Sequence, residues 1–263
     1  MTFDHDTHPV AGLAGQMNAL VTGASRGIGL ALLAKLLDNR HVRQIIAVAR
    51  TASTSVELTA LSARAEGRLV LIDADLTSDD DLARLAAAVE ASSAPLHLVI
   101  NAAGVLHAAG VQPEKAIEQI SRASLEQIFS LNAFAPILLA KALMPALCQG
   151  QRAVFASLSA RVGSIGDNRA GGWYAYRASK AAQNQLMKTF AIELARRNRH
   201  ACCLMLHPGT VDTALSKPFQ ARVAADALFS TERAASQLLA IIAASTALDT
   251  GRFIAWDGQD VAW

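Results

Sequence analysis

The chain is predicted to fold as a single doubly wound α/β domain, in which helices cover both faces of a seven-stranded parallel sheet. Short apolar runs alternate with longer segments of helical periodicity. The apolar runs are continuous rather than alternating, which is typical of parallel strands buried on both faces. No repeat, linker or low-complexity stretch divides the 263 residues. We therefore expect one domain over residues 17–263, preceded by a flexible N-terminal tail over residues 1–16.

Strands and helices are expected to follow one another as short apolar runs and longer segments with apolar residues three and four apart. The strand candidates are Asn18–Thr22, Gln44–Ala49, Leu69–Asp73, Leu96–Ile100, Ala153–Ser157, Ala201–Leu206 and Arg252–Ala255. The helix candidates are Ile28–Leu37, Asp79–Glu90, Leu125–Leu147, Ser179–Arg197 and Glu232–Ala247. Pro136 and Pro145 lie within Leu125–Leu147, and because a proline ring removes a helical hydrogen bond, we expect a kink or a break there.

Composition excludes several classes of protein. Hydrophobic residues make up 52% of the chain and charged residues 17%, the opposite of a disordered protein. The net charge of +2, without basic clusters, argues against nucleic-acid binding. The longest uncharged runs, around Gln127–Ala140 and Ala234–Leu248, fall short of the roughly 18 residues of a membrane span and are read as buried helices. Three cysteines are too few for a disulfide framework, so we expect a cytoplasmic protein without membrane contact.

A glycine-rich turn joins the first strand to the first helix. Its sequence, Thr-Gly-Ala-Ser-Arg-Gly-Ile-Gly over residues 22–29, lets backbone N–H groups approach a phosphate at a positively polarised helix start. The spacing Gly-x-x-x-Gly-x-Gly differs from the common dinucleotide fingerprint, and an ordinary strand-to-helix turn is the alternative. The residues expected to contact a dinucleotide here are Gly23, Ser25, Arg26, Gly27, Ile28 and Gly29.

The end of the second strand bears on the choice of dinucleotide. NAD-binding units place an acidic residue there, about 20 residues beyond the glycines, to bind the ribose hydroxyls. This chain has Ala49 followed by Arg50, and Arg26 stands in the glycine turn. Two guanidinium groups can hold a 2′-phosphate by bidentate hydrogen bonds, so NADP(H) is favoured over NAD(H). The alternative is that both are solvated surface arginines.

A tyrosine and a lysine four residues apart point to acid–base chemistry. Tyr176 and Lys180 would share one face of a helix, one turn apart. A phenol with a pKa of about 10 is a poor proton donor and a worse base at neutral pH, and a neighbouring ammonium lowers that pKa. A shift of two to three units requires roughly 3–4 kcal/mol from the site. The pair is a weak signal alone, because many solvated helices carry it.

Taken together, these segments resemble the short-chain dehydrogenase/reductase family. The turn over residues 22–29, Asn101-Ala102-Ala103-Gly104, Asn132, Ser159, Tyr176 with Lys180, and Pro208-Gly209 follow the family's order. The resemblance extends from about Asn18 to Trp263 and implies a Rossmann fold. Within the family, residues 161–168, 171–174 and 256–263 look like the C-factor branch, which is close to the carbonyl-reductase-like sniffer proteins.

The resemblance implies a role for each matching residue. Tyr176 would donate a proton to a carbonyl oxygen, or act as the base in the reverse direction, while Lys180 would lower its pKa and hold the nicotinamide ribose. Ser159 would hydrogen-bond the substrate oxygen, and Asn132 would keep a water-mediated proton path open beneath Lys180. The remaining cofactor contacts would come from Asp75, Leu76, Asn101, Ala102, Ala103, Gly104, Pro208, Gly209, Thr210, Val211 and Thr213.

The serine is the one departure from the family pattern. In many members it stands thirteen residues before the tyrosine, whereas Ser159 stands seventeen before Tyr176. Ser157 and Ser164 are near enough to be rivals, and Ala160 occupies a neighbouring register. The extra residues lie between positions 166 and 173 and would reshape the substrate mouth.

The function expected is that of an NADP(H)-dependent carbonyl reductase or alcohol dehydrogenase acting on a small carbonyl or alcohol substrate. The alternative is an NADP(H)-binding signalling or regulatory protein with little turnover, which the C-factor resemblance supports. The family often pairs through the helices here over residues 125–147 and 179–197, so a homodimer or homotetramer is the expected assembly. No metal is expected, since His5 and His8 lack ligand partners at the required spacing. Trp173 is read either as a wall for an apolar substrate or as core packing.

Overall fold

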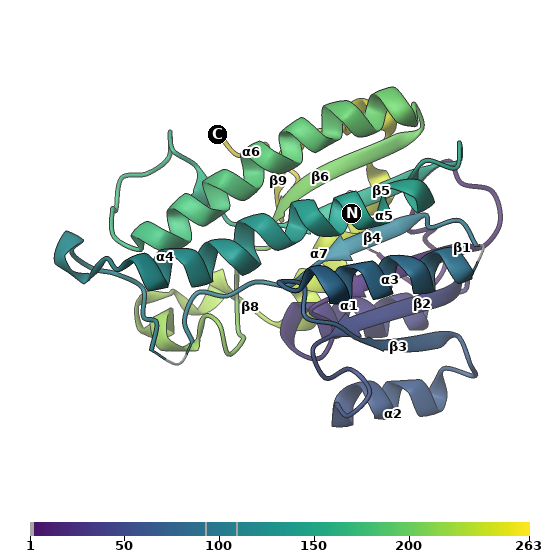
Figure 1. The fold of residues 1–263 in the computed structure, drawn as a ribbon, viewed down its shortest axis with the longest axis horizontal. Coiled ribbons are helices and arrows are strands. Elements are labelled where there is room, and N and C mark those ends of the chain that lie inside the picture. Colours follow the sequence, from purple (N-terminus) through teal and green to yellow (C-terminus); the bar gives the residue numbers. More distant parts are fainter. Residues whose placement is uncertain (1–2, 93, 109) are drawn as a thin grey trace.

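The computed structural model describes residues 3–92, 94–108 and 110–263 and confirms the predicted architecture (Figure 1). Seven parallel strands form one sheet in the order β3-β2-β1-β4-β5-β6-β9. The chain first adds strands on one side of β1 and then continues on the other side from β4. Doubly wound sheets bind their ligands at the carboxyl ends of the strands beside this switch point.

All seven predicted strands are present, with ends shifted by at most two residues. They are β1 (Met17–Thr22), β2 (Val42–Ala49), β3 (Leu69–Asp73), β4 (Leu98–Asn101), β5 (Ala153–Leu158), β6 (Ala201–His207) and β9 (Arg252–Ala255). The helices are α1 (Gly27–Leu37), α2 (Val56–Arg64), α3 (Asp79–Ala91), α4 (Arg122–Phe129), α5 (Ala135–Leu147), α6 (Tyr174–Arg197) and α7 (Thr231–Ala244). Two further strands, β7 (Thr210–Val211) and β8 (Leu228–Phe229), form a separate parallel pair.

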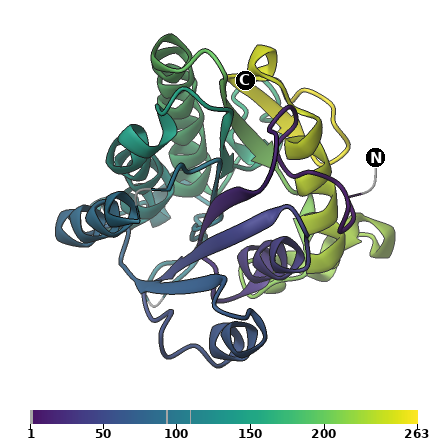
Figure 2. The ribbon, with the colours of Figure 1, turned by 90° about the vertical axis from the view of Figure 1, so that its right-hand side faces the viewer.

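Each face of the large sheet buries its own apolar cluster, because successive side chains of a strand point to opposite faces. In β5, Val154, Ala156 and Leu158 pack on the side of α1 and α7. Phe155 packs on the other side, with residues of α3, α5 and α6. Figure 2 shows these helices on the two sides of the sheet. Burial on both faces explains why the strands read as continuous apolar runs.

One helix was missed, and two predicted helices need correction. Helix α2 was not predicted, because it buries little more than Leu58 and so has no clear apolar stripe. The segment predicted over residues 125–147 is interrupted by a π-helical turn, Ser130–Phe134. Pro136 stands in the first turn of α5, where its missing N–H breaks no helical bond. Helix α6 begins at Tyr174, five residues before the predicted start, which places Tyr176 in its first turn.

The stretch Arg122–Leu147 is long and apolar enough to cross a membrane by length and composition alone. Its most apolar window has a mean hydropathy of 1.5, and 44% of that window is buried inside the protein. Several of the buried residues, among them Leu139 and Leu143, belong to the apolar cluster shared with α3 and α6. Such packing is typical of a core helix.

The N-terminal tail predicted to be flexible is instead packed against the domain over residues 3–16; residues 1 and 2 lie outside the described residues. Val10 is fully buried and Phe3 nearly so, and both join the apolar cluster that includes α1 and α7. The prediction was wrong because these two apolar anchors are isolated among Asp and His residues, so no periodic pattern marks them.

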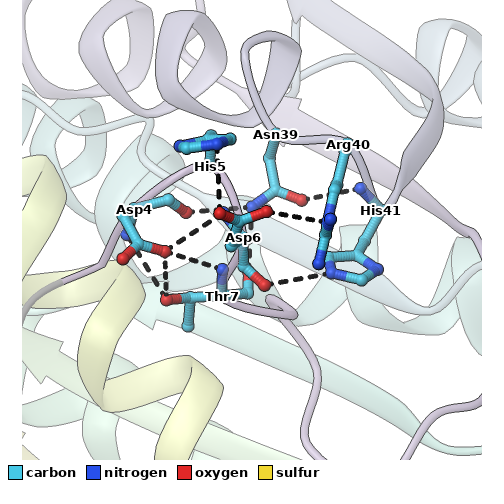
Figure 3. A network of polar contacts seen from close by, with 7 residues as sticks. All are labelled: Asp4, His5, Asp6, Thr7, Asn39, Arg40 and His41. Atoms are coloured by element: carbon cyan, nitrogen blue, oxygen red, sulfur yellow. Dashed lines mark hydrogen bonds and ion pairs between the residues drawn. The ribbon is translucent and has the colours of Figure 1, made fainter.

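A polar network fastens the same segment to the turn after α1 (Figure 3). Asn39 donates to the carbonyl oxygens of Asp4 and Thr7 at 3.1 and 2.8 Å. Arg40 pairs with Asp6 at 2.9 Å. Within the described ranges, no three His, Cys, Asp or Glu side chains gather as metal ligands would.

Candidate active site

The predicted site residues follow the strands at one edge of the sheet. The glycine turn follows β1, Arg50 follows β2, and Asp75 and Leu76 follow β3. Asn101 ends β4, residues 102–104 follow it, and Pro208 and Gly209 follow β6. Because all these strands are parallel, their carboxyl ends meet at one edge, and the fold therefore gathers the predicted segments there.

The glycine turn lies against the loop after β4. Gly23 and Gly27 have φ values of 64° and 55°, in the left-handed region that favours glycine. A Cβ atom at Gly23 would lie 2.8 Å from the backbone nitrogen of Ala103. At Gly27 a Cβ atom would lie 3.3 Å from the Thr213 side chain, which places the segment after β7 beside the turn. The turn therefore needs both glycines in order to pass between its neighbours.

The start of α1 differs from those of α2, α3, α4 and α7. Helices α2, α3, α4 and α7 each begin with a serine whose side chain accepts a backbone N–H. At α1 the N-cap residue is Arg26, which forms no such bond, and the first turn carries no acidic residue. The N–H groups of this first turn therefore have no side-chain acceptor, and an anion can bind them.

Arg26 and Arg50 are exposed, and neither forms an ion pair with any described carboxylate. Asp75 accepts hydrogen bonds from the backbone and side chain of Thr77 and so closes the turn before α3. Leu76 is buried in the apolar cluster. The two arginines are thus free to bind a phosphate, whereas Asp75 and Leu76 have structural contacts of their own.

The loop after β4 and the segment after β6 complete this edge. Asn101 is fully buried, and its amide accepts a hydrogen bond from Thr22 and donates one to Ser157. Ala102, Ala103 and Gly104 are partly exposed. Gly209, with a φ of 79°, packs so closely that a Cβ atom would lie 2.7 Å from the Phe229 ring. Thr210 and Val211 form β7, a strand that the sequence did not indicate.

Asn132 lies in the π-helical turn, a distortion often found at functional sites. Its Oδ1 accepts the Val105 N–H at 2.8 Å, and its Nδ2 donates to the Val105 carbonyl at 2.7 Å and to Ser179 Oγ at 3.1 Å. A Cβ atom at Gly104 would lie 3.5 Å from Asn132 Oδ1 and 3.7 Å from Lys180 Nζ. The structure thus brings Asn132, Gly104 and Lys180 together.

Burial governs the protonation of Tyr176 and Lys180. Burial raises the pKa of the Tyr176 phenol to about 12. It lowers the pKa of the Lys180 ammonium from 10.5 to about 7. In the polypeptide alone, loss of water thus disfavours the phenolate, and the lowering of the Tyr176 pKa by Lys180 in the cofactor-bound site stays a prediction. A protonated phenol is nevertheless the form that can donate a proton.

The lowered pKa of Lys180 predicts how stability depends on pH. The unfolded chain keeps the lysine proton up to about pH 10.5, whereas the folded chain releases it near pH 7. The free energy of unfolding should therefore rise from pH 7 to about pH 9, by at most about 1.4 kcal/mol per unit. Urea unfolding of Lys180→Met should lack this rise, and a variant of the exposed Lys115, Lys115→Met, should retain it. Equal slopes in wild type and Lys180→Met would contradict the lowered pKa.

The three candidate serines lie in different environments. Ser157 is fully buried, and its Oγ accepts from Asn101 and Gln183. Ser164 is buried and accepts the Asp167 N–H. Ser159 is 4% exposed, and its hydroxyl donates to Asn184 Oδ1 at 2.6 Å.

Ser159 is not in hydrogen-bond contact with Tyr176 or Lys180. Its partner Asn184 stands eight residues after Tyr176 on α6, about 12 Å farther along the helix axis. Ala160, the next residue along the chain, has no hydroxyl. The Ser159 hydroxyl is therefore engaged with Asn184, and it has to leave this partner before it can bind a substrate oxygen.

An aromatic group borders the tyrosine. The Trp173 ring packs edge-on against Tyr176 and Phe219, with centroids 6.3 and 4.9 Å apart. Phe219 belongs to a 3-10 helix, Lys217–Arg222, and His107 from the β4 loop packs edge-on against it at 6.0 Å. Trp173 has a φ of 53°, unusual for a bulky residue. Because its ring contacts both Tyr176 and Phe219, Trp173 forms a wall between Tyr176 and the segment after β7.

Two polar neighbours of Lys180 on α6 were not predicted from the sequence. Gln183 contacts Lys180 and Ser157, and Asn184 contacts Ser159. Residues three and four positions after Lys180 share its helix face, so this spacing was the signal that could have found them. A buried glutamate, Glu114, was also missed; its carboxylate accepts the Ala175 N–H in the first turn of α6.

Comparison with known proteins agrees with this geometry. The chain matches the family model described as short chain dehydrogenase over residues 17–224. It is 30% identical to 1-hydroxy-2-glutathionyl-2-methyl-3-butene dehydrogenase of Rhodococcus sp. (strain AD45), over 93% of this chain and 98% of that protein. It is 31% identical to C-signal of Myxococcus xanthus, over 67% of this chain and 98% of that protein.

Solved structures show the same likeness. The NADPH-bound carbonyl reductase from chicken fatty liver superposes with a TM-score of 0.83 at 26% identity, covering 95% of this chain and all (100%) of that one. The carbonyl reductase Sniffer of D. melanogaster has a TM-score of 0.83 at 27% identity, covering 94% of this chain and 100% of that one. These matches confirm the predicted C-factor and sniffer-like branch, and the chain belongs to the short-chain dehydrogenase family.

Proposed function

We propose that the protein is an NADP(H)-dependent oxidoreductase that interconverts a carbonyl and an alcohol. The observation that carries this proposal is the buried pair of Tyr176 and Lys180, one turn apart on α6 beside Asn132 and Gly104. A protein that only binds a nucleotide has no need for a phenol and an ammonium buried together. Buried ionisable groups with shifted pKa values are typical of catalytic sites.

The residues present fit NADP(H). The uncapped start of α1 and its glycine turn suit the diphosphate, and the exposed Arg26 and Arg50 suit a 2′-phosphate. Gly104 and Lys180 would lie against the nicotinamide ribose. The NADPH-bound chicken carbonyl reductase, similar over nearly all of this chain, supports the same assignment. The other proposed contacts are those of Ser25, Ile28, Ala102, Ala103, Pro208, Thr210, Val211 and Thr213.

When bound, NADPH supplies a hydride to the carbonyl carbon. Tyr176 donates its phenolic proton to the carbonyl oxygen, so that C=O becomes CH–OH. The charge left on the tyrosine oxygen is stabilised by the Lys180 ammonium, the nearest cation on the same helix face. With a pKa of about 12, the phenol is protonated at neutral pH, which is the form that donates a proton to a carbonyl oxygen.

Ser159 is proposed as the second hydrogen-bond donor to the substrate oxygen, with a smaller contribution than Tyr176. For this, the Ser159 hydroxyl first has to break the hydrogen bond that it donates to Asn184 Oδ1. Asn184 Nδ2 is buried and without a partner among the described residues. If the amide rotates by 180°, this nitrogen donates to Ser159 Oγ and releases the hydroxyl proton for the substrate.

The wall formed by Trp173 and Phe219 supports an apolar substrate. Both rings are partly exposed and stand between Tyr176 and the segment after β7. We propose that this wall packs against the apolar body of an aldehyde, ketone or quinone while its oxygen faces Tyr176.

A signalling role is the second candidate function, supported by the similarity to C-signal of Myxococcus xanthus. In that case the protein would bind NADP(H) with little turnover. The two functions are distinguished by following NADPH oxidation with a panel of aldehydes, ketones and quinones. Turnover that requires Tyr176 supports the reductase. Tight NADPH binding without turnover of any member of the panel supports the signalling role and overturns the reductase.

A second copy of the chain is the proposed partner. A groove of about 590 Å³ runs between α5 and α6, and Ile137, Met144 and Phe190 line it. Ile192, also on α6, is 48% exposed. Apolar surface at two neighbouring helices suits isologous pairing. Analytical ultracentrifugation should show a dimer or tetramer that Ile192→Glu dissociates; a monomer at all concentrations would contradict the pairing.

A further inference from the structure

A continuous row of buried polar side chains leads from the glycine turn to Lys180. Thr22 Oγ1 donates to Asn101 Oδ1 at 2.7 Å, and Asn101 Nδ2 donates to Ser157 Oγ at 3.0 Å. Gln183 Nε2 donates to the same Ser157 oxygen at 2.8 Å, and Lys180 Nζ donates to Gln183 Oε1 at 2.8 Å. The first four residues are each 0% exposed. Four elements, β1, β4, β5 and α6, thus hold Gln183 in one position.

The amide of Gln183 has one acceptable orientation. Its Nε2 uses both N–H groups, one on Ser157 Oγ and one on the Leu158 carbonyl at 3.1 Å. If the amide were rotated by 180°, its NH₂ group would face the Lys180 ammonium, and two donors would oppose each other. The surroundings therefore direct Oε1 at Lys180.

Lys180 Nζ has three N–H donors when charged. One donates to the Leu158 carbonyl at 2.9 Å and one to Gln183 Oε1 at 2.8 Å. Among the described residues, no third hydrogen-bond partner of Nζ is found. Gly104 lies beside Nζ, where its lack of a side chain leaves room for a ligand group. Two protein acceptors thus fix the nitrogen while one donor stays available.

We propose that Gln183 is a positioning residue that favours the charged form of Lys180 and directs one of its N–H groups toward the nicotinamide ribose. The inference rests on the proposed function, in which Lys180 supports Tyr176. A hydrogen bond to an ammonium is stronger than one to a neutral amine, so the Gln183 oxygen favours the charged form. That preference opposes the burial that favours the neutral amine.

The other groups packed around Lys180 do not supply this stabilisation. Tyr176 is the titratable group on the same helix face and is protonated at neutral pH. The 3-10 turn after β5 carries Arg161, which is exposed and pairs with Asp167. At the end of β6, burial lowers the pKa of His207 to about 4, so it is neutral. The π-helical turn presents the neutral Asn132.

The test is an NMR titration of the protein with ¹³C-labelled lysine, in which the Lys180 signal is assigned by its loss in Lys180→Met. Gln183→Leu removes the acceptor and should lower the titration midpoint of Lys180 by about one to two pH units. Gln183→Glu supplies a charged acceptor and should raise the midpoint by at least about one unit. Gln185→Leu, an exposed glutamine two residues away on α6, is the matched control and should leave the midpoint unchanged.

Opposite shifts in Gln183→Leu and Gln183→Glu support the inference. If both variants fold and titrate Lys180 as the wild type does, Gln183 is only a structural residue and the inference is overturned. If Gln183→Leu fails to fold, the shift in Gln183→Glu decides alone. These readouts do not depend on turnover, so they separate failure of this inference from failure of the proposed function.

A kinetic measurement then links Gln183 to the reaction. Where carbonyl reduction is observed, its loss at alkaline pH should begin at lower pH in Gln183→Leu and at higher pH in Gln183→Glu. A structural defect would reduce the rate at every pH without changing the pH at which the alkaline loss of activity begins.

Discussion

Replacing Tyr176 with phenylalanine is expected to lower kcat for carbonyl reduction by about 100- to 10,000-fold, the range for loss of a positioned general acid. The substitution removes one oxygen from a buried ring and leaves the Trp173 contact in place. The affinity for NADPH should change little, because the phenol is proposed to act on the substrate oxygen. Stopped-flow or steady-state NADPH oxidation measures kcat, and fluorescence titration measures the affinity.

The chain offers a matched control, since it has 2 tyrosines. Tyr174 is 39% exposed, two residues before Tyr176 in the same helical turn, so Tyr174→Phe should retain activity. Ser159→Ala should cost far less than Tyr176→Phe, because the Ser159 hydroxyl is engaged with Asn184. Unchanged turnover in Tyr176→Phe would remove the phenol from the mechanism.

The double variant Arg26→Ala/Arg50→Ala is expected to bind NADPH at least about 100-fold more weakly than the wild type. Each guanidinium is exposed and without a described carboxylate partner, so its hydrogen bonds are available to a 2′-phosphate. A hydrogen bond to a charged group contributes about 1.5–3 kcal/mol, and two such losses correspond to about 100-fold or more in Kd. Each single variant should show a smaller loss. Fluorescence titration with NADPH and NADH measures the effect.

The affinity for NADH separates a phosphate contact from general damage. NADH lacks the 2′-phosphate, so its Kd should stay nearly constant in the double variant. Arg43→Ala is the matched control, because Arg43 is an exposed arginine at the amino end of β2, far from the edge that Arg50 follows. Equal losses for NADPH and NADH, or a wild type that prefers NADH, would contradict the assignment of the two arginines.

The strand positions were predictable because burial on both faces leaves a simple pattern of continuous apolar runs. Features with few apolar residues were not predictable. Helix α2 buries little more than Leu58, and β7 pairs two residues with β8. The N-terminal segment is anchored by two isolated apolar residues, Phe3 and Val10. In each case the stabilising contacts come from parts of the chain distant in sequence.

The site was predictable where backbone conformation or helical spacing dictates residue type. The glycines of residues 23–29 and the spacing of Tyr176 and Lys180 are of this kind. The partners of Lys180 and Ser159 were missed. Gln183 and Asn184 acquire a role through Ser157 on β5 and Ser159 directly after it, which are separated from them by more than twenty residues. The burial that raises the pKa of Tyr176 in the polypeptide alone could not be predicted either, because the extent of burial is not visible in the sequence.

Deuterium transfer is the most direct measurement of the proposed reaction. NADPH carrying deuterium at both C4 positions of the nicotinamide is incubated with the protein and each carbonyl of the panel, and the alcohol product is analysed by mass spectrometry. We expect one deuterium on the former carbonyl carbon with the wild type, and at least about 100-fold less deuterated alcohol in the same time with Tyr176→Phe. Bound NADPH with no deuterated alcohol from any carbonyl would show that the buried tyrosine and lysine do not serve carbonyl reduction.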